Sequence, residues 1–434
     1  MALTWSDYGQ GSGRRKSGGG LIAGLALGVV AVTVIIWALA SPKGDGEGSP
    51  PPPPVGSDAP PVGGGAESTG AVEEVPPPVA PAGKIPGEEE LEDGRFSRAV
   101  SKLKAFLKEA PAGREPRALV LLGQAQRGAK DPKAAGETFR GLLAKYEMRP
   151  EAAEALYHLS FMEADPETSE AYLVRAIAPL YARTPGAALA GGVLGDRLWD
   201  QDVAGAAPNH KTWELVRRAY TRALLGLEGE RRQEVVTRLR RLNKYLVFSK
   251  AECTGAEFYT VRPGDSVSVI ARRKGKAVTI GSIRRMNGLD KKATIRPGES
   301  LKILHAPCFI EVNKGKYRLT AYLADYFFGE YTISLGSEET PTPPGTYEIE
   351  KKDYEPIWYY KGAAIRYGDP RNILGTRWMG FKNKPGASRL GIHGTTEPKT
   401  IGTMVSHGCI RMLNQDVEEL CDFALIGTLV EVRD

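Results

Sequence analysis

Two histidines and a cysteine lie close together near the end of this 434-residue chain, which has only five His and four Cys residues. His393 stands in the segment 391–395, and Cys409 follows His407 in the segment 406–411. A cysteine attacks as the thiolate, and its ordinary pKa near 8.5 leaves little thiolate at neutral pH without a nearby base or cation. An imidazole meets that need as a general base or an ion-pair partner. These residues predict nucleophilic catalysis by Cys409.

Two neighbours of the cysteine extend this prediction. Gly408 gives the backbone the freedom to turn successive amides toward one point, as an oxyanion hole requires. Arg411 is placed to hold a substrate carboxylate through paired, charge-assisted hydrogen bonds. The alternatives are an inert packed thiol and a zinc site, but one Cys and two His without a second Cys pair make a poor zinc set. We therefore expect an enzyme that uses neither a metal nor another cofactor.

The residues around this motif are expected to form strands. Apolar and polar residues alternate over 309–312, 317–322, 331–335 and 347–349, with a Pro/Gly turn at 342–345. This pattern predicts a mainly β domain over residues 309–434. Cys421, within an apparent helix over 415–425, is expected to be a buried free thiol.

The segment 309–434 resembles the L,D-transpeptidase (YkuD-type) catalytic domain. That family's signature is a His followed about 14 to 17 residues later by Ser/Thr-His-Gly-Cys-x-Arg/Asn. The resemblance also includes the Pro-Thr-Pro-x-Gly turn at 341–345, Asn372, Gly375 and Arg377-Trp378. It implies a two-step acyl transfer on peptidoglycan, in which Cys409 attacks the third residue of a tetrapeptide donor stem and releases the terminal D-alanine. An acceptor amine then resolves the thioester into a 3-to-3 cross-link.

The same resemblance implies the roles of the site residues. His393 is the general base, steadied by the Gly394 carbonyl, and the resemblance favours it over His407, although the residues alone leave both open. The amides of His407, Gly408 and Cys409 hold the oxyanion, and Arg411 orients the donor. The expected substrate-binding residues are Ser406, Gly394, Asn414, Arg377 and Trp378, with Asn414 bracing the loop.

Three alternatives to cross-linking remain. Water as the acceptor would make the protein an L,D-carboxypeptidase, and a protein lysine would make it a wall-attachment enzyme. A non-catalytic wall-binding scaffold is the third alternative, which the intact motif from Ser406 to Arg411 argues against.

A small module is expected over residues 257–305. A strand ending near Val261, a turn at Gly264-Asp265, two short helices, Asn287-Gly288 and a closing strand after Pro297-Gly298 give a βααβ order. This pattern resembles a LysM module, which implies recognition of N-acetylglucosamine-containing glycans such as peptidoglycan. Residues 258–304 hold 11 basic and 3 acidic residues, so an anionic partner is also expected. In an exported protein that partner would be stem-peptide carboxylates or other wall polymers, and no nucleic acid; a solvated face without a partner is the alternative.

Two further cysteines flank this module. In a βααβ unit whose first and last strands pair antiparallel, both chain ends emerge side by side. Cys253 and Cys308 could thus approach the roughly 5.5 Å Cα separation of a disulfide, and we predict a bridge between them.

The middle of the chain, residues 91–250, has a helical apolar period. Asp131-Pro132 and Asp165-Pro166 place a capping Asp before a Pro suited to the first turn. The window from Leu122-Gly123 to Leu142 resembles a tetratricopeptide repeat, but without a convincing second copy. An all-α region, either a degenerate repeat array or a generic bundle, is expected to serve as a spacer or to contact a protein partner.

The N-terminal segment predicts attachment to a membrane. Residues 21–40 are uncharged over 20 positions, enough for one membrane helix, and Arg14, Arg15 and Lys16 precede them. Residues 1–20 would be a cytoplasmic tail, and everything after 40 would lie outside the cytoplasm in the cell envelope. Secretion after cleavage near Ala40 is the alternative. Residues 41–90, rich in Pro and Gly, predict a disordered linker.

Overall fold

The computed structural model describes residues 83–203, 209–275, 278–385 and 388–434. The predicted cytoplasmic tail and membrane helix, and nearly all of the predicted linker, lie outside these residues. Among the described helices, none is both long and apolar enough to cross a membrane.

The middle of the chain is helical, as the apolar period predicts. Its helices are α1 (Glu88–Glu92), α2 (Phe96–Leu107), α3 (Glu115–Gly128), α4 (Pro132–Tyr146), α5 (Glu151–Ser160), α6 (Pro166–Ala176), α7 (Pro185–Leu198), α8 (His210–Ala223) and α9 (Gly229–Leu246), with short turns η2 (Pro179–Tyr181) and η3 (Trp199–Val203). The side chain of Asp131 accepts from the Ala134 amide, and that of Asp165 from the Thr168 amide, so both expected N-caps are present. The helical region extends further toward the N-terminus than the predicted start at residue 91, since Ile85 is buried in the same apolar cluster as Leu103.

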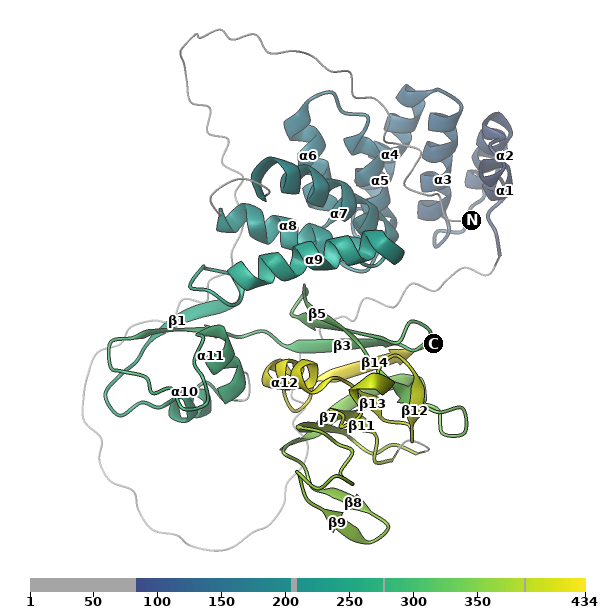
Figure 1. The fold of residues 1–434 in the computed structure, drawn as a ribbon. Coiled ribbons are helices and arrows are strands. Elements are labelled where there is room, and N and C mark those ends of the chain that lie inside the picture. The colour runs from purple at the N-terminus through teal and green to yellow at the C-terminus, as the bar shows by residue number, and fades with distance from the viewer. Residues whose placement is uncertain (1–82, 204–208, 276–277, 386–387) are drawn as a thin grey trace, which may run out of the picture. The chain divides into compact units, whose positions relative to one another are not determined.

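Consecutive helices of this region pack against one another (Figure 1). In the window that resembles a repeat, Gly123 lies against the ring of Phe139, where a Cβ would come within 2.4 Å of ring carbons. A small residue facing a large one lets α3 and α4 approach closely.

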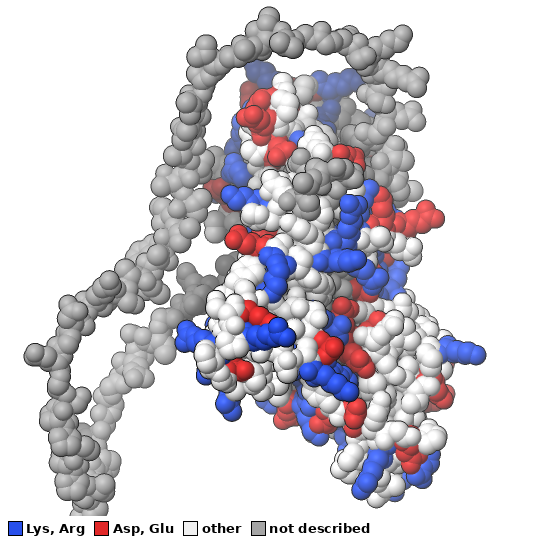
Figure 2. Space-filling view, turned by 60° about the vertical axis from the view of Figure 1, so that its left-hand side comes forward, with Lys and Arg blue, Asp and Glu red and all other residues white. Residues whose placement is uncertain are grey.

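The small module has the predicted βααβ order. It consists of β1 (Ala256–Thr260), α10 (Val267–Arg273), α11 (Ile280–Met286) and β2 (Ser300–Leu304), and β1 pairs antiparallel with β2. Its own apolar core includes Ile270, Ile283 and Ile303, all fully buried. Its basic residues are partly paired within the described residues, as Arg285 is with Asp422 at 2.8 Å. Figure 2 likewise shows Lys and Arg interspersed with Asp and Glu on the face drawn.

The predicted disulfide between Cys253 and Cys308 is absent, because both side chains are free, buried thiols. Past the end of the β1–β2 pair the two chain segments separate. Cys253 lies beside Lys302, whereas Cys308 enters the neighbouring sheet and pairs with Leu323. Burial raises the pKa of the Cys308 thiol to about 12.

The C-terminal domain is built on a mixed eight-stranded sheet, in the order β13-β11-β10-β7-β14-β3-β4-β5. The domain contains β3 (Cys308–Asn313), β4 (Arg318–Leu323), β5 (Tyr326–Thr332), β6 (Leu335–Gly336), β7 (Gly345–Tyr354), β8 (Trp358–Tyr360), β9 (Ala363–Ile365), β10 (Arg377–Phe381), β11 (Gly391–His393), η5 (Pro398–Thr400), β12 (Met404–Ser406), β13 (Ile410–Arg411), α12 (Asn414–Phe423) and β14 (Leu429–Arg433). Strands β8 and β9 form a separate two-stranded hairpin.

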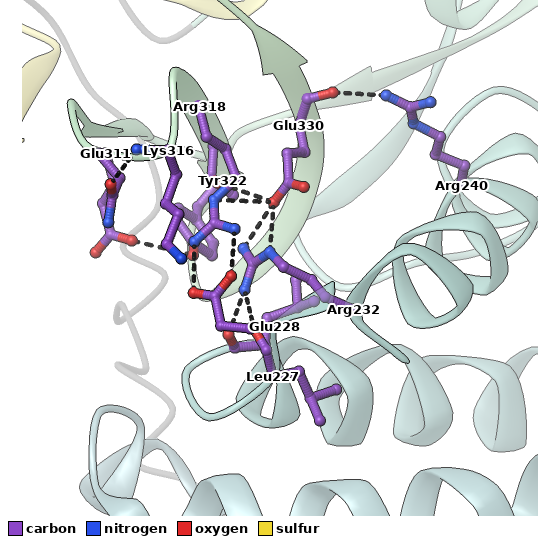
Figure 3. A network of polar contacts seen from close by, with 12 residues as sticks. Leu227, Glu228, Arg232, Arg240, Glu311, Lys316, Arg318, Tyr322 and Glu330 are labelled. Atoms are coloured by element: carbon purple, nitrogen blue, oxygen red, sulfur yellow. Dashed lines mark hydrogen bonds and ion pairs between the residues drawn. The ribbon is translucent and has the colours of Figure 1, made fainter. Parts of the chain in front are cut away.

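Helices α8 and α9 cover the edge strand β5 (Figure 1). The Asn243 amide donates to the carbonyls of Phe327 and Phe328 at 3.0 and 2.9 Å, and Arg240 donates to the carbonyl of Glu330. The Glu330 carboxylate pairs with Arg232 at 2.6 Å, and Figure 3 shows this pair within a wider network. The helical region therefore satisfies backbone groups that β5 does not use in the sheet.

The small module is fixed to its neighbours by buried polar contacts. The ammonium group of Lys302, which has no exposed surface, donates to the carbonyl of Leu246 at the end of α9 and to that of Ala251 in the following loop. Arg285 of α11 pairs with Asp422 of α12, and Gly281 packs so tightly there that a Cβ would lie 2.1 Å from a carboxylate oxygen.

Candidate active site

A cleft of about 730 Å³ opens in the C-terminal domain beside Cys409. Its wall includes most of the residues that the sequence singles out for chemistry: His393, Trp378, Ser406, His407, Cys409 and Arg411. The rest of the wall comes from the end of β7, the segment from Glu355 through β8, Ile373, Leu374 and residues 388–390.

Cys409 stands in a turn between β12 and β13. Gly408 has φ +99, a backbone conformation that favours glycine. The Thr342 hydroxyl donates to the Gly408 carbonyl at 3.0 Å, and the Ser406 hydroxyl to the Cys409 carbonyl at 2.6 Å. Both carbonyls are thereby held, while the amides of 407, 408 and 409 donate to no partner within the described residues. Three successive free amides beside the sulfur suit the binding of an oxyanion.

The side chain of Cys409 is half-buried in the wall of the cleft. Burial raises the pKa of this thiol to about 11, against the opposing effects of the Gly391 amide and the Arg411 charge. The Sγ–H group points toward the Arg389 carbonyl at 3.8 Å. The direction of this pKa shift favours the neutral thiol over the thiolate.

His393 ends β11 and is 2% exposed. Its Nδ1 lies 2.6 Å from the Gly394 carbonyl oxygen, and because a carbonyl only accepts, Nδ1 carries the hydrogen. Nε2 is then the nitrogen with a free lone pair. Burial, with a smaller contribution from Arg411, lowers the pKa of His393 to about 4, so the ring is neutral near pH 7. A neutral imidazole of fixed tautomer can take a proton from a thiol.

His407 differs from His393 in its surroundings. His407 is exposed at the rim of the cleft, whereas His393 is buried with the ring of Trp378 at 5.8 Å between centroids. Burial and a fixed hydrogen bond orient His393, and they favour it as the base over His407.

Arg411 reaches the cleft from β13, which pairs parallel with β11 so that Arg411 is in register with His393. It is 6% exposed, and the carboxylate of Glu397 lies 3.7 Å from it on a largely exposed side chain. Its buried Nε has no hydrogen-bond partner among the described residues. A planar guanidinium with unused donors fits an incoming carboxylate.

Asn414 fastens the loop that follows His393. Its Oδ1 accepts from the amides of Thr376 and Thr395, both at 3.2 Å, and its Nδ2 donates to the Thr395 carbonyl at 2.9 Å. A Cβ on either Gly375 or Gly394 would lie 2.2 Å from this Oδ1. Asn414 thus holds two loops together from the start of α12, without lining the cleft itself.

The structure does not place Arg377 in the cleft. Side chains alternate along a strand, so Trp378 faces His393 while Arg377 points to the other face of β10. There Arg377 stacks over the Tyr354 ring at 4.7 Å and donates to the Thr376 carbonyl. The sequence-based expectation that Arg377 binds substrate is therefore corrected, because its side chain does not line the cleft. Gly394 and Gly408 shape the site through their backbone.

Sequence reasoning missed the aromatic wall of the cleft. Trp358, Tyr359 and Tyr360 line it, together with Leu374. The available signal in the sequence was the run Trp358-Tyr359-Tyr360, because Trp and Tyr side chains, with an apolar face and a polar tip, are enriched at binding surfaces.

Comparisons with known proteins agree with this geometry. Residues 308–432 match the L,D-transpeptidase catalytic domain of the YkuD family, and residues 259–304 match the LysM domain. YqjB of Bacillus subtilis (strain 168), which carries an L,D-transpeptidase name, is 37% identical over 127 residues, covering 29% of this chain and 71% of YqjB. YkuD of the same strain, similarly named, is 30% identical over 181 residues, covering 40% of this chain and 98% of YkuD.

Among solved structures, L,D-transpeptidase 3 from Mycobacterium tuberculosis is 16% identical, with 32% of this chain and 76% of that chain covered at a TM-score of 0.25. The family match, the two relatives and the cysteine site lead to one conclusion. This chain belongs to the YkuD family of L,D-transpeptidases, cysteine-dependent enzymes that act on peptidoglycan stem peptides, and it carries a peptidoglycan-binding LysM domain.

Proposed function

We propose that this protein forms 3-to-3 cross-links between peptidoglycan stems through a thioester on Cys409. The observation that carries the proposal is a single cleft that combines a thiol, a neutral buried imidazole, three free amides and a guanidinium with unused donors.

In the first step, Nε2 of His393 takes the thiol proton as Sγ attacks the carbonyl of the third stem residue. The amides of His407, Gly408 and Cys409 hold the oxyanion, and Arg411 holds a donor carboxylate. The imidazolium then protonates the leaving amine, so that D-alanine departs and the thioester remains.

In the second step, an acceptor amine attacks the thioester carbonyl and loses a proton to His393. The collapse of this intermediate returns the proton to the sulfur as the new amide forms. No water is consumed, and each cross-link releases one D-alanine. If water replaces the amine, the same thioester yields a trimmed tripeptide, which is the L,D-carboxypeptidase alternative.

We further propose that the enzyme works in the cell envelope, anchored by residues 21–40 and joined to its folded part by the Pro/Gly-rich segment. The uncharged run of 20 residues after a basic tail supports an anchor, and the LysM match supports a location at the wall. The helical region serves as a spacer or as a contact for a protein partner.

The test uses the protein with muropeptides that carry tetrapeptide stems, analysed by mass spectrometry. The expected product is a dimer whose mass is the sum of two stems less one D-alanine, and Cys409→Ala should give none. Cys421→Ala is the matched control, since this second thiol is fully buried away from the cleft and should leave dimer formation intact. Tripeptide products alone would establish trimming instead, and unchanged substrate with the wild-type protein would refute enzymatic activity.

A further inference from the structure

We propose that the β8–β9 hairpin with its flanks, residues 354–367, is a saccharide-binding subsite of the cleft. This segment, the aromatic hairpin, would take the sugar to which the donor stem is attached. The inference rests on the proposed function, because it needs a peptidoglycan substrate at Cys409.

The aromatic hairpin is unusually rich in exposed rings. Five of the chain's 17 Tyr and 6 Trp residues lie within these 14 positions. Tyr359 is 73% exposed, Tyr367 45% and Tyr360 41%, whereas the exposed ring of Tyr354 stacks with Arg377 on the other face of β10. Large rings that contribute only to folding are normally buried, whereas Trp358, Tyr359 and Tyr360 line the cleft.

Ring stacking and hydrogen bonds to Asn372 hold the aromatic hairpin in place. Trp358 and Tyr360 stack on one face of β8, with centroids 4.6 Å apart and planes inclined by 15°, while Tyr359 lies between them in sequence and points the other way. The buried side-chain amide of Asn372 donates to the carbonyl of Pro356, just before β8, at 2.9 Å and to that of Ile365, at the end of β9, at 3.0 Å. A surface held in this way loses little conformational entropy on binding.

The chemistry of the patch favours a neutral sugar. Tyr and Trp offer an apolar face and a polar tip, and a pyranose ring offers an apolar C–H face edged by hydroxyl and amide groups. The charged residues of the segment are only Glu355, Lys361 and Arg366, so it lacks the charge density that an anionic polymer would require. An N-acetylated sugar fits both features.

The place of the patch in the cleft fits the length of the substrate. The attacked carbonyl belongs to the third stem residue, and the sugar is joined to the amino end of the first. Three extended residues span on the order of 10 Å. Tyr359, Tyr360 and Cys409 line the same continuous cleft, so a stem held at the sulfur can place its sugar on the rings.

The experiment compares two donors with each enzyme variant: a disaccharide-tetrapeptide and the same tetrapeptide without sugar. The measured quantity is kcat/KM for the sugar-bearing donor divided by kcat/KM for the free peptide. In Tyr359→Ala this ratio should fall about fivefold, because one ring that would stack on the sugar is lost. Tyr359→Phe keeps the ring and should restore most of the ratio. Phe161→Ala is the control, because it removes an exposed ring from the helical region, 47% exposed, and should keep the wild-type ratio.

The outcomes separate this inference from the proposed function. An equal fall for both donors would show that the aromatic hairpin holds the peptide, and an unchanged ratio would show that it holds no sugar; either result overturns the inference while leaving cross-linking intact. Failure of the wild-type protein to process either donor would instead overturn the proposed function. The LysM domain does not confound the ratio, since it is the same in every variant.

Discussion

The protonation state of the nucleophile leads to a prediction that separates two ways of activating Cys409. Burial raises the pKa of its thiol to about 11 and lowers the pKa of His393 to about 4. Both directions oppose a resting thiolate–imidazolium pair, because each favours the uncharged form of its group. His393 should therefore act as a base only when the substrate is attacked.

The magnitude follows from the two pKa values. With a pKa of about 11 in place of the ordinary value near 8.5, on the order of one molecule in 10⁴ carries the thiolate at pH 7, about three hundredfold less than for an unperturbed cysteine. The rate of alkylation by iodoacetamide should then rise about tenfold per pH unit from pH 7 to 10, since the thiolate is the reactive form.

The assay is alkylation of the folded protein across this pH range, followed by peptide mapping. Mapping distinguishes Cys409 from Cys253, Cys308 and Cys421, which are buried. The second variable is His393→Ala. It should change alkylation by less than about threefold but lower thioester formation by at least about a hundredfold, the usual contribution of a general base.

Two results would refute this reasoning. A plateau of the alkylation rate near neutral pH would show a stabilised thiolate, and a fall of alkylation by tenfold or more in His393→Ala would show that the imidazole is its ion-pair partner. Either result would require a resting ion pair in place of base-assisted attack.

Two further predictions concern stability. Asn414→Ala removes three hydrogen bonds and leaves the buried Thr395 amide unpaired, so urea unfolding should show a free energy of unfolding lower by about 2–4 kcal/mol. The control Asn313→Ala removes one hydrogen bond at the end of a strand and should lower the free energy of unfolding by under about 1 kcal/mol. Equal losses in the two variants would contradict the bracing role of Asn414. For His393, the folded pKa of about 4 lies below the ordinary imidazole value of 6.5, so the unfolded chain binds the proton first as pH falls. Stability should therefore drop by up to about 3 kcal/mol between pH 6.5 and 4, and this part of the pH dependence should vanish in His393→Ala; a drop of the same size in the variant would contradict it.

The catalytic residues that the sequence proposes lie in two short segments. Spacing of this kind is local information, and so are the Asp–Pro helix starts at 131 and 165 and the strand-helix-helix-strand order of the LysM domain. The same holds for Gly408, whose φ of +99 explains why glycine precedes the nucleophile.

What the sequence could not predict depends on contacts between distant segments. From the sequence, Cys409 could be activated by a general base or exist as a thiolate paired with an imidazolium. Desolvation of the Cys409 thiol and the His393 ring in the fold favours the general base. Arg377 was expected at the substrate, but the phase of β10 turns it toward Tyr354. The cysteines flanking the LysM domain were expected to meet, but the chain after β2 leads into the neighbouring sheet instead.

The attachment of α8 and α9 to β5 has a consequence for how the enzyme is divided. A fragment limited to residues 308–434 would expose the outer side of β5, with the carbonyls of Phe327, Phe328 and Glu330 and the flanking aromatic side chains deprived of their partners. An uncovered edge strand can pair with a strand of another chain, so we expect such a fragment to self-associate or aggregate. The helices α8 and α9 thus cover this edge strand from within the same chain.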